Sequence, residues 1–339
     1  MMCKIKFFLI MLSLSGLLLI SGCQDDNSPS QSQQDVVYPG CTKDASTRSD
    51  NRTPETVVAD WSQPTKLQPP VNTLCPEDAI EISDDGQYLY FMFTADILDS
   101  LSVAEILAPE NNTFRVERTG GPGTFGEPVY YDLAKGTEGS LDGELCFNAN
   151  GSKVYFHSNR AANLGYNNDP YMDDFQDIYV ADIIDGTPGE GRNLGGRVNS
   201  VWPDGEHALH PDDSSLYFAS LRPGGHGGAD IWLSVLTDTG WTEAVCLDTP
   251  LNSVAGDLQP TFTADGDTVY FTSDRGLIGA AVYRSVRTGE RWGTPELVIR
   301  GVVGEPSLTA DGRYLYFVHV LSDAAGVFDA DIYYCERVP

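Results

Sequence analysis

The sequence predicts an all-β fold, a five-bladed β-propeller closed by an N-terminal strand that completes the last blade. A strand–turn–strand pattern with Asp or Asn at its turn and Tyr-Phe in its second strand occurs five times. Most copies are followed by a third strand and then by a fourth strand with an aromatic residue at its head. One strand of the fourth type precedes the first hairpin, and none follows the last third strand. A unit that recurs along the whole chain indicates a repeat architecture.

The hairpin is clearest in its fourth copy, Gln259–Arg275. Phe262, Val269 and Phe271 occupy alternating positions there, on either side of a tight Asp265-Gly266 turn. Alternation with period two is typical of strands, and Asp-Gly is a strong hairpin signal. The other copies are Ile82–Phe91, Phe147–Phe156, Leu209–Phe218 and Leu308–Phe317.

Two further strands complete each predicted blade. The third strands are Asp177–Val180, Asp230–Leu233, Ala281–Arg284 and Asp331–Tyr334. The fourth strands are Trp61–Leu67, Phe125–Tyr130, Trp241–Leu247 and Trp292–Val298, with a weaker copy near Arg192–Leu194. Because Trp61–Leu67 precedes the first hairpin, it must complete the last blade, and the closed ring then has no open radial edge.

The first two blades carry insertions, at residues 95–124 and 161–176, whereas the last blades are short. Both insertions join a second strand to a third strand, so both should open on the face where the innermost strands begin. Long loops on one face of a rigid ring are the usual place for binding. We therefore expect this loop-bearing face to bind the ligand.

Parts of the repeat match a known pattern. Residues 219–232 read Ala-Ser-Leu-Arg-Pro-Gly-Gly-His-Gly-Gly-Ala-Asp-Ile-Trp, and residues 270–276 read Tyr-Phe-Thr-Ser-Asp-Arg-Gly. These stretches resemble the repeat of TolB-type propellers, periplasmic relatives of the WD40-like repeat. The resemblance implies a propeller over residues 56–339, although with five blades rather than the six of TolB itself. It implies no particular ligand, because relatives range from envelope scaffolds to peptidases and lyases.

The N-terminal segment resembles a bacterial lipoprotein signal peptide. Lys4 and Lys6 precede the apolar run Phe7–Ile20, which is short for a membrane span, and the small residues Ser21-Gly22 lead to Cys23. The resemblance implies that residues 1–22 are removed and that Cys23 is lipidated, with palmitate among its acyl chains. An ordinary secretory signal cut elsewhere is the alternative.

Residues 23–55 follow as the lipidated Cys and a disordered tether, rich in Ser, Gln, Asp, Asn, Pro and Thr. Gln24 at the second mature position resembles the sorting pattern of outer-membrane lipoproteins, whereas Asp25-Asp26 also fit a surface-export signal. We expect the protein at the cell outer membrane, with the choice between its periplasmic side and the cell surface left open.

The chain is strongly acidic, with 49 acidic and 21 basic residues and a formal net charge of −28 at pH 7. Binding to nucleic acid or to anionic lipid surfaces depends on Lys and Arg, so this composition argues against both. A negative field favours cations and cationic proteins, or simply keeps an exported protein soluble. We expect a monomer that meets the membrane only through its lipid.

Of the seven cysteines, Cys3 leaves with the signal and Cys23 carries lipid. No pair has the C-x-x-C spacing of a zinc site. Two cysteines lie in predicted strands and are expected to be small core residues, Cys146 and Cys246. Three lie near the ends of the domain, and an oxidising compartment permits one disulfide among Cys41, Cys75 and Cys335.

Acidic residues recur where the innermost strands begin. When the five copies are aligned on the turn residue, one position holds Ala79, Glu144, Glu206, Gln259 and Glu305. The position two residues earlier holds Glu77, Asp142, Asp204 and Asp257. Strand periodicity points both sets toward the central channel. The candidate ligand- or cation-binding residues are Asp142, Glu144, Asp204, Glu206, Asp257 and Glu305.

These acids admit three roles. Their oxygens suit a hard cation such as Ca²⁺. Apart from this ion, we expect no cofactor. Like charges in a restricted cavity also raise one another's pKa, as acid/base catalysis requires. The favoured role is structural, because Arg160, Arg222 and Arg275 end the second strands on the same face and can pair with the acids of neighbouring blades. No histidine forms a convincing nucleophile–base pair with a Ser or Cys.

The favoured function is that of a non-catalytic cell-envelope lipoprotein that binds an envelope protein, a peptide or a glycan. The alternative is a glycoside hydrolase resembling the five-bladed arabinanase and fructosidase families, with catalytic candidates Asp78, Glu144, Glu206 and Glu305. The acids recur with the repeat, as structural residues do, whereas Glu77 and Asp78 stand together only in blade one. Fold alone does not decide between the two functions.

Overall fold

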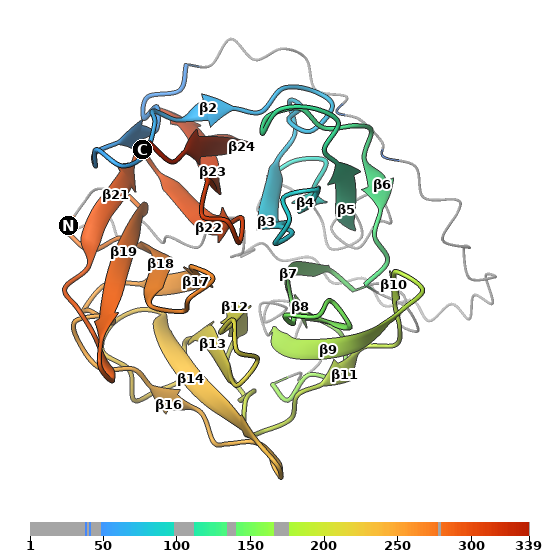
Figure 1. Ribbon diagram of the computed structural model, residues 1–339, viewed down its shortest axis with the longest axis vertical. Coiled ribbons are helices and arrows are strands. Elements are labelled where there is room, and N and C mark those ends of the chain that lie inside the picture. The colour runs from blue at the N-terminus through green and yellow to red at the C-terminus, as the bar shows by residue number, and fades with distance from the viewer. Residues whose placement is uncertain are drawn as a thin grey trace, which may run out of the picture.

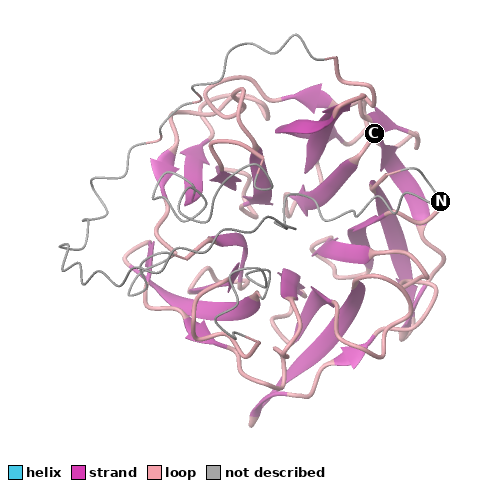
Figure 2. Cartoon of the chain, turned by 180° about the vertical axis from the view of Figure 1, so that it is seen from behind, coloured by secondary structure: helices cyan, strands magenta, loops and turns pink. Residues whose placement is uncertain are grey.

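A computed structural model describes residues 38, 41, 49–97, 112–133, 140–165, 176–276 and 279–338. Five antiparallel sheets stand around a common centre as the blades of a propeller (Figure 1). Seen from behind, the described part of the chain consists of strands and loops, without a helix (Figure 2). The predicted five-bladed, all-β architecture is therefore confirmed. No helix among the described residues has the length and apolar character needed to cross a membrane.

Each blade begins with its innermost strand. Blade 1 contains β3 (Glu77–Ile82), β4 (Tyr88–Phe93), β5 (Asn112–Glu117) and β6 (Val129–Tyr130). Blade 2 contains β7 (Asp142–Phe147), β8 (Lys153–Ser158), β9 (Asp177–Ile184), β10 (Thr187–Pro188) and β11 (Arg192–Asn193). Blade 3 contains β12 (Asp204–Leu209), β13 (Ser215–Ser220), β14 (Asp230–Thr237), β15 (Gly240–Trp241) and β16 (Val245–Cys246).

The last two blades share the N-terminal part of the domain. Blade 4 contains β17 (Asp257–Phe262), β18 (Thr268–Ser273), β19 (Ala281–Thr288), β20 (Arg291–Trp292), β21 (Glu296–Arg300) and β1 (Glu55–Thr56). Blade 5 contains β22 (Val303–Leu308), β23 (Tyr314–Asp323), β24 (Gly326–Glu336) and β2 (Thr65–Lys66).

The predicted closure is confirmed, because β2 pairs with β24 as the outermost strand of blade 5. Trp61 forms an isolated bridge with Arg337 just before it. The same segment also makes a contact that the sequence did not predict: β1 pairs with β21 at the outer edge of blade 4. One short segment therefore holds two neighbouring blades, as Figure 1 shows near the label for β21 and the C-terminus.

Every innermost strand has a β-bulge after its second residue. The bulged residues have φ angles of 45° to 55°, in the left-handed region: Ala79, Glu144, Glu206, Gln259 and Glu305. A bulge adds one residue to the strand and breaks the alternation of side chains. The expectation that period two directs both sets of acids the same way is therefore wrong, and the two sets lie in different surroundings.

Buried asparagines join three of the blade-to-blade links to the preceding blade. Asn199, on the link from β11 to β12, donates its amide to the carbonyl of Ile178 at 2.9 Å and accepts the Ile178 N–H at 2.9 Å. Equivalent exchanges join Asn72 to Ile332 and Asn252 to Ile231. The repeated triplets Val71-Asn72-Thr73, Val198-Asn199-Ser200 and Leu251-Asn252-Ser253 are a sequence signal for these joints that our reading missed.

The open question of disulfide pairing is resolved in favour of Cys41 and Cys75. The bridge ties the segment before the domain to the start of blade 1, where the ring of Tyr38 packs edge-on against Phe93 and Phe114. Cys335 is a buried free thiol. Cys146 is buried as expected, whereas Cys246 is only half-buried.

Candidate functional site in the central channel

Three of the candidate acids are paired with arginines. Asp142, Asp204 and Asp257 are each 0% exposed. Each carboxylate accepts a hydrogen bond from the arginine that follows the second strand of the same blade, namely Arg160, Arg222 and Arg275. The sequence suggested such arginine pairs, but between neighbouring blades, whereas here each pair forms within one blade.

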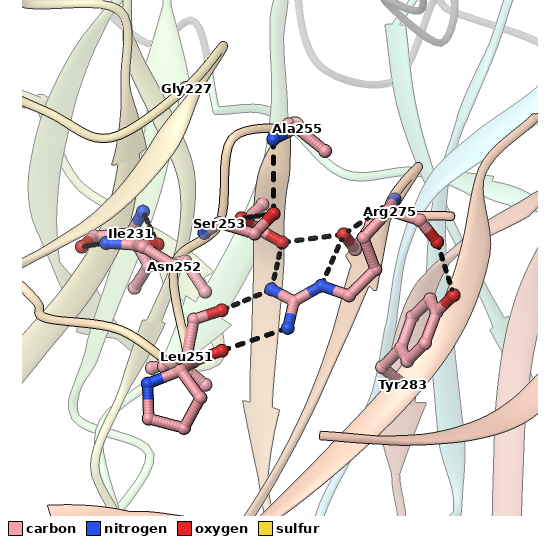
Figure 3. A network of polar contacts seen from close by, with 12 residues as sticks. Gly227, Ile231, Leu251, Asn252, Ser253, Ala255, Arg275 and Tyr283 are labelled. Carbon is pink, nitrogen blue, oxygen red and sulfur yellow. Dashed lines mark hydrogen bonds and ion pairs between the residues drawn. The ribbon is translucent and has the colours of Figure 1, made fainter. Parts of the chain in front are cut away.

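Each arginine also fixes a link between blades. In blade 4, Arg275 donates to Ser273 Oγ at 3.0 Å, to the carbonyl of Pro250 at 3.0 Å and to the carbonyl of Leu251 (Figure 3). The guanidinium carbon also lies 5.0 Å from the ring centre of Phe271, a cation–π contact. The guanidinium of Arg275 thus donates its hydrogen bonds to groups of the protein itself, and the Asp257–Arg275 pair holds the link between blades in place.

Blade 1 has no such arginine. Glu77, at the position of the paired aspartates, is 0% exposed and accepts hydrogen bonds from the N–H of Thr73 at 3.0 Å and from Thr73 Oγ1 at 2.6 Å. Burial raises the pKa of Glu77 well above its usual range. This carboxyl is therefore also engaged by its own blade.

The acids of the other aligned position, Glu144, Glu206 and Glu305, cluster in the channel together with Asp78. Asp78 is 2% exposed, Glu144 is 8% and Glu305 is 7%, and Glu206 is half-buried. Burial raises the pKa of Asp78 to about 8, and the nearby Glu206 carboxylate adds to the shift. Burial likewise raises the pKa of Glu144, Glu206 and Glu305 well above the usual range. The structure thus brings together the four acids that the sequence offered as catalytic candidates.

Two histidines share this channel, and the sequence reading did not place them there. His157 on β8 is 1% exposed, and its Nδ1 lies 3.2 Å from Oε2 of Glu144. His207, next to Glu206 on β12, is 5% exposed. Burial lowers the pKa of His157, and it lowers the pKa of His207 to about 3, so both rings are neutral at physiological pH.

Many polar atoms of this cluster have no hydrogen-bond partner among the described residues. They are one oxygen each of Asp78, Glu206 and Glu305, Nε2 of His157 and both ring nitrogens of His207, while His157 Nδ1 and Glu144 Oε2 face each other at 3.2 Å without hydrogen-bond geometry. Most buried polar groups in proteins are hydrogen-bonded, so such a concentration is unusual. The Asp–Arg pairs, by contrast, are satisfied within the protein.

A cavity of about 250 Å³ leads toward the cluster, and Glu144, His207 and Glu305 line it. Its wall also includes residues of the turns between first and second strands: Asp84, Asp213, Ala264 and Ala310. The cavity therefore faces the hairpin turns. The two insertions follow second strands and leave from the opposite end of the blades, and about half of their residues, 98–111 and 166–175, lie outside the described part of the chain.

Comparison with known proteins finds similarity among solved structures alone. No family model and no curated protein matches the chain. Among solved structures, putative TolB from Agrobacterium tumefaciens shares 15% identity with a TM-score of 0.43, over 79% of this chain and 94% of that one. TolB from Acinetobacter baumannii shares 15% identity with a TM-score of 0.39, over 73% of this chain and 53% of that one, so the chain spans about half of its length.

A thermostable family-43 glycoside hydrolase shares 14% identity with a TM-score of 0.48, over 78% of this chain and 92% of that one. At these identities the likeness concerns the fold alone, and the same fold occurs in proteins of different function. The arrangement of the five sheets by itself shows that the chain is a five-bladed β-propeller.

Proposed function

We propose that this chain is a non-catalytic, lipid-anchored binding protein of the bacterial envelope whose channel mouth receives a basic side chain of a protein or peptide. The observation behind this proposal is the acidic mouth of the cavity. Burial raises the pKa of Asp84, and the neighbouring carboxylates of Asp85 and Asp213 add to the shift. A Lys or Arg side chain entering there relieves this repulsion, whereas a neutral glycan does not.

The size of the cavity supports the same proposal. At about 250 Å³ it is smaller than the roughly 300–1,000 Å³ typical of pockets for drug-sized ligands. It suits a single side chain presented by a larger partner. The net charge of −28 also favours the approach of a cationic partner.

The test measures binding of a lysine-containing peptide and of the same peptide with acetylated lysine. We expect the lysine peptide to bind more tightly, and its affinity to fall with salt. Asp84→Asn combined with Asp213→Asn should weaken binding about tenfold or more, which corresponds to about 1.4 kcal/mol. The matched control is Asp238→Asn, at an exposed turn between β14 and β15. If the double variant and the control lose equal affinity for the peptide, the peptide is attracted by the overall negative charge and the proposed site at the channel mouth is refuted.

The anchor is tested separately. Cys23→Ser should abolish incorporation of labelled palmitate and release the protein from outer-membrane fractions, because no other lipid attachment is proposed. The released protein should keep its melting temperature, since the change lies outside the blades. Unchanged membrane fractionation of the variant would disprove the anchor and leave the binding site unaffected.

A glycoside hydrolase is the second candidate, and the gathering of Asp78, Glu144, Glu206 and Glu305 with raised pKa values favours it. Such an enzyme needs two carboxyl groups about 5 to 9.5 Å apart around a glycosidic bond. Here an oxygen of Glu144 lies within 4.8 Å of an oxygen of Glu206, which is closer than that range. Three of the four acids are also less than a tenth exposed, and both facts count against this candidate. Hydrolysis of any glycan in a screen, lost in Glu206→Gln, would establish this candidate and refute the non-catalytic proposal.

A further inference from the structure

We propose that Glu144, His157 and Glu206 form a binding site for one divalent transition-metal ion of the Zn²⁺ class at the inner end of the channel. The site differs from the Ca²⁺ site considered from the sequence, because one of its ligands is an imidazole nitrogen. It also leaves out the three aspartates, which the arginines already hold.

The three side chains converge to the degree that a metal site requires. One ligand atom from each residue lies within 4.8 Å of the other two. In a tetrahedral site with bonds of about 2.0–2.1 Å, neighbouring ligand atoms stand roughly 3.3 Å apart. The His157 Nδ1 to Glu144 Oε2 distance is already 3.2 Å. The Glu206 carboxylate, within 4.8 Å of both, completes the set by moving inward by at most about 1.5 Å.

The backbone makes room for the imidazole. His157 pairs in register with Gly143 of β7, and Gly205 of β12 faces the ring from the next blade. A Cβ at Gly205 would lie 3.1 Å from Nδ1, closer than most side-chain contacts, and a Cβ at Gly143 would lie 3.7 Å from Nε2. The glycine that precedes each glutamate therefore lets a histidine from the second strand reach the channel.

The chemistry of the cluster favours a metal ion. His157 is 1% exposed; its Nδ1 lies 3.2 Å from Glu144 Oε2 without the geometry of a hydrogen bond, and its Nε2 has no hydrogen-bond partner among the described residues. A neutral imidazole is the form of histidine that binds metals. A dication also offsets the repulsion between Glu144 and Glu206. Nitrogen and carboxylate ligands together suit Zn²⁺ and its neighbours, whereas Ca²⁺ prefers oxygen alone.

The ion has a route to this position. Glu144 and His207 line the cavity of about 250 Å³, so the cluster adjoins the space that opens at the hairpin-turn face. His207 follows Glu206 and its ring nitrogens also have no hydrogen-bond partner in the described part of the chain.

The experiment uses the mature protein without a polyhistidine tag, stripped with a chelator and titrated calorimetrically with Zn²⁺, Mn²⁺ and Ca²⁺. We expect about one Zn²⁺ per chain, a higher melting temperature with Zn²⁺, and binding of Zn²⁺ at least tenfold tighter than Ca²⁺. Co²⁺ should bind competitively and give visible absorption bands of a mixed nitrogen and oxygen site.

Three variants test the ligands. His157→Ala and Glu206→Gln should each weaken Zn²⁺ binding by roughly 100-fold or more, since even changes beyond the direct ligands cost about 10- to 100-fold. Gly205→Ala should weaken it by displacing the ring. The matched control is His226→Ala, which removes an exposed imidazole in a glycine-rich loop.

Absence of stoichiometric Zn²⁺ binding by the folded protein would overturn the inference, as would a His157→Ala variant that binds Zn²⁺ like the wild type. If His157→Ala does not fold, unchanged affinity in Glu206→Gln and Gly205→Ala would overturn it equally. Binding of Ca²⁺ alone, insensitive to His157, would mean a carboxylate site in place of the one proposed.

Discussion

Trp61 lies where the N-terminal segment crosses from blade 4 to blade 5, and replacing it should weaken both blades at once. The side chain is 3% exposed and packs into a cluster with Val298 and Ile299 of blade 4 and Phe317 of blade 5. Its indole N–H donates to the hydroxyl of Tyr270 at 3.3 Å. The perturbation is Trp61→Ala.

The magnitude follows from burial. Removing a fully buried Trp side chain typically costs about 3–5 kcal/mol, which includes the cavity that remains. For a domain of this size, about 1 kcal/mol lowers the melting temperature by roughly 2–4 °C. We therefore expect Trp61→Ala to melt about 6–20 °C below the wild type. Trp61→Phe keeps most of the apolar surface and loses the hydrogen bond, so it should cost only about 1 kcal/mol.

The assay is urea unfolding followed by circular dichroism, with thermal melts in parallel. The control is Trp202→Ala, because Trp202 is 44% exposed and its removal should change stability by less than about 0.5 kcal/mol. Deletion of residues 56–68, which removes β2 and Thr56 of β1, should unfold the domain. A Trp61→Ala variant that melts with the wild type, or a deletion that keeps the wild-type midpoint and cooperativity, would refute this account of ring closure.

Arg222→Met should lower the free energy of unfolding by about 3–5 kcal/mol, because it leaves Asp204, 0% exposed, without its guanidinium; urea unfolding with wild-type stability would contradict the pairing. Burial raises the pKa of Glu81 from 4.5 to about 8. Between these two pH values Glu81 is ionised in the unfolded chain but protonated in the folded protein. The free energy of unfolding therefore falls as pH rises toward 8. Glu81→Gln should remove the contribution of this group to the fall, so the difference in stability between variant and wild type should widen from about pH 5 to about pH 8; a constant difference would contradict the raised pKa. Reduction of the Cys41–Cys75 bridge, which closes a loop of sequence separation 34, should cost up to about 4 kcal/mol in unfolding experiments, whereas an unchanged midpoint would mean that the loop adds nothing to the fold.

The number of blades and the identity of the closing strand were readable from the sequence because their signals are local. A turn such as Asp265-Gly266 and the pair Tyr270-Phe271 define a hairpin within ten residues or so, and repetition supplies the rest. The pairing of β1 with β21 was not readable, since Glu55–Thr56 is too short to show a pattern. The pairing of Cys41 with Cys75 depended on distances that the sequence does not contain.

The central site was half predictable. Glu144, Glu206 and Glu305 were found because they recur with the repeat, but the alternation rule failed at the bulge, where an extra residue turns the strand. His157 was missed because a single histidine in an apolar strand carries no local signal. Its position depends on Gly143 of the same blade and Gly205 of the next one, contacts that the sequence alone does not specify.

The closure described above also constrains the order in which the protein can fold. Asn72 and Ile332 exchange hydrogen bonds although they stand 260 residues apart, so this joint cannot form until nearly the whole chain is available. Contacts of such high contact order are slow to form. Until they do, β24 keeps an unpaired edge, which is a hazard for association with other chains. The interval between synthesis of the last residues and capture of β2 is therefore the period in which a chaperone protects the chain best.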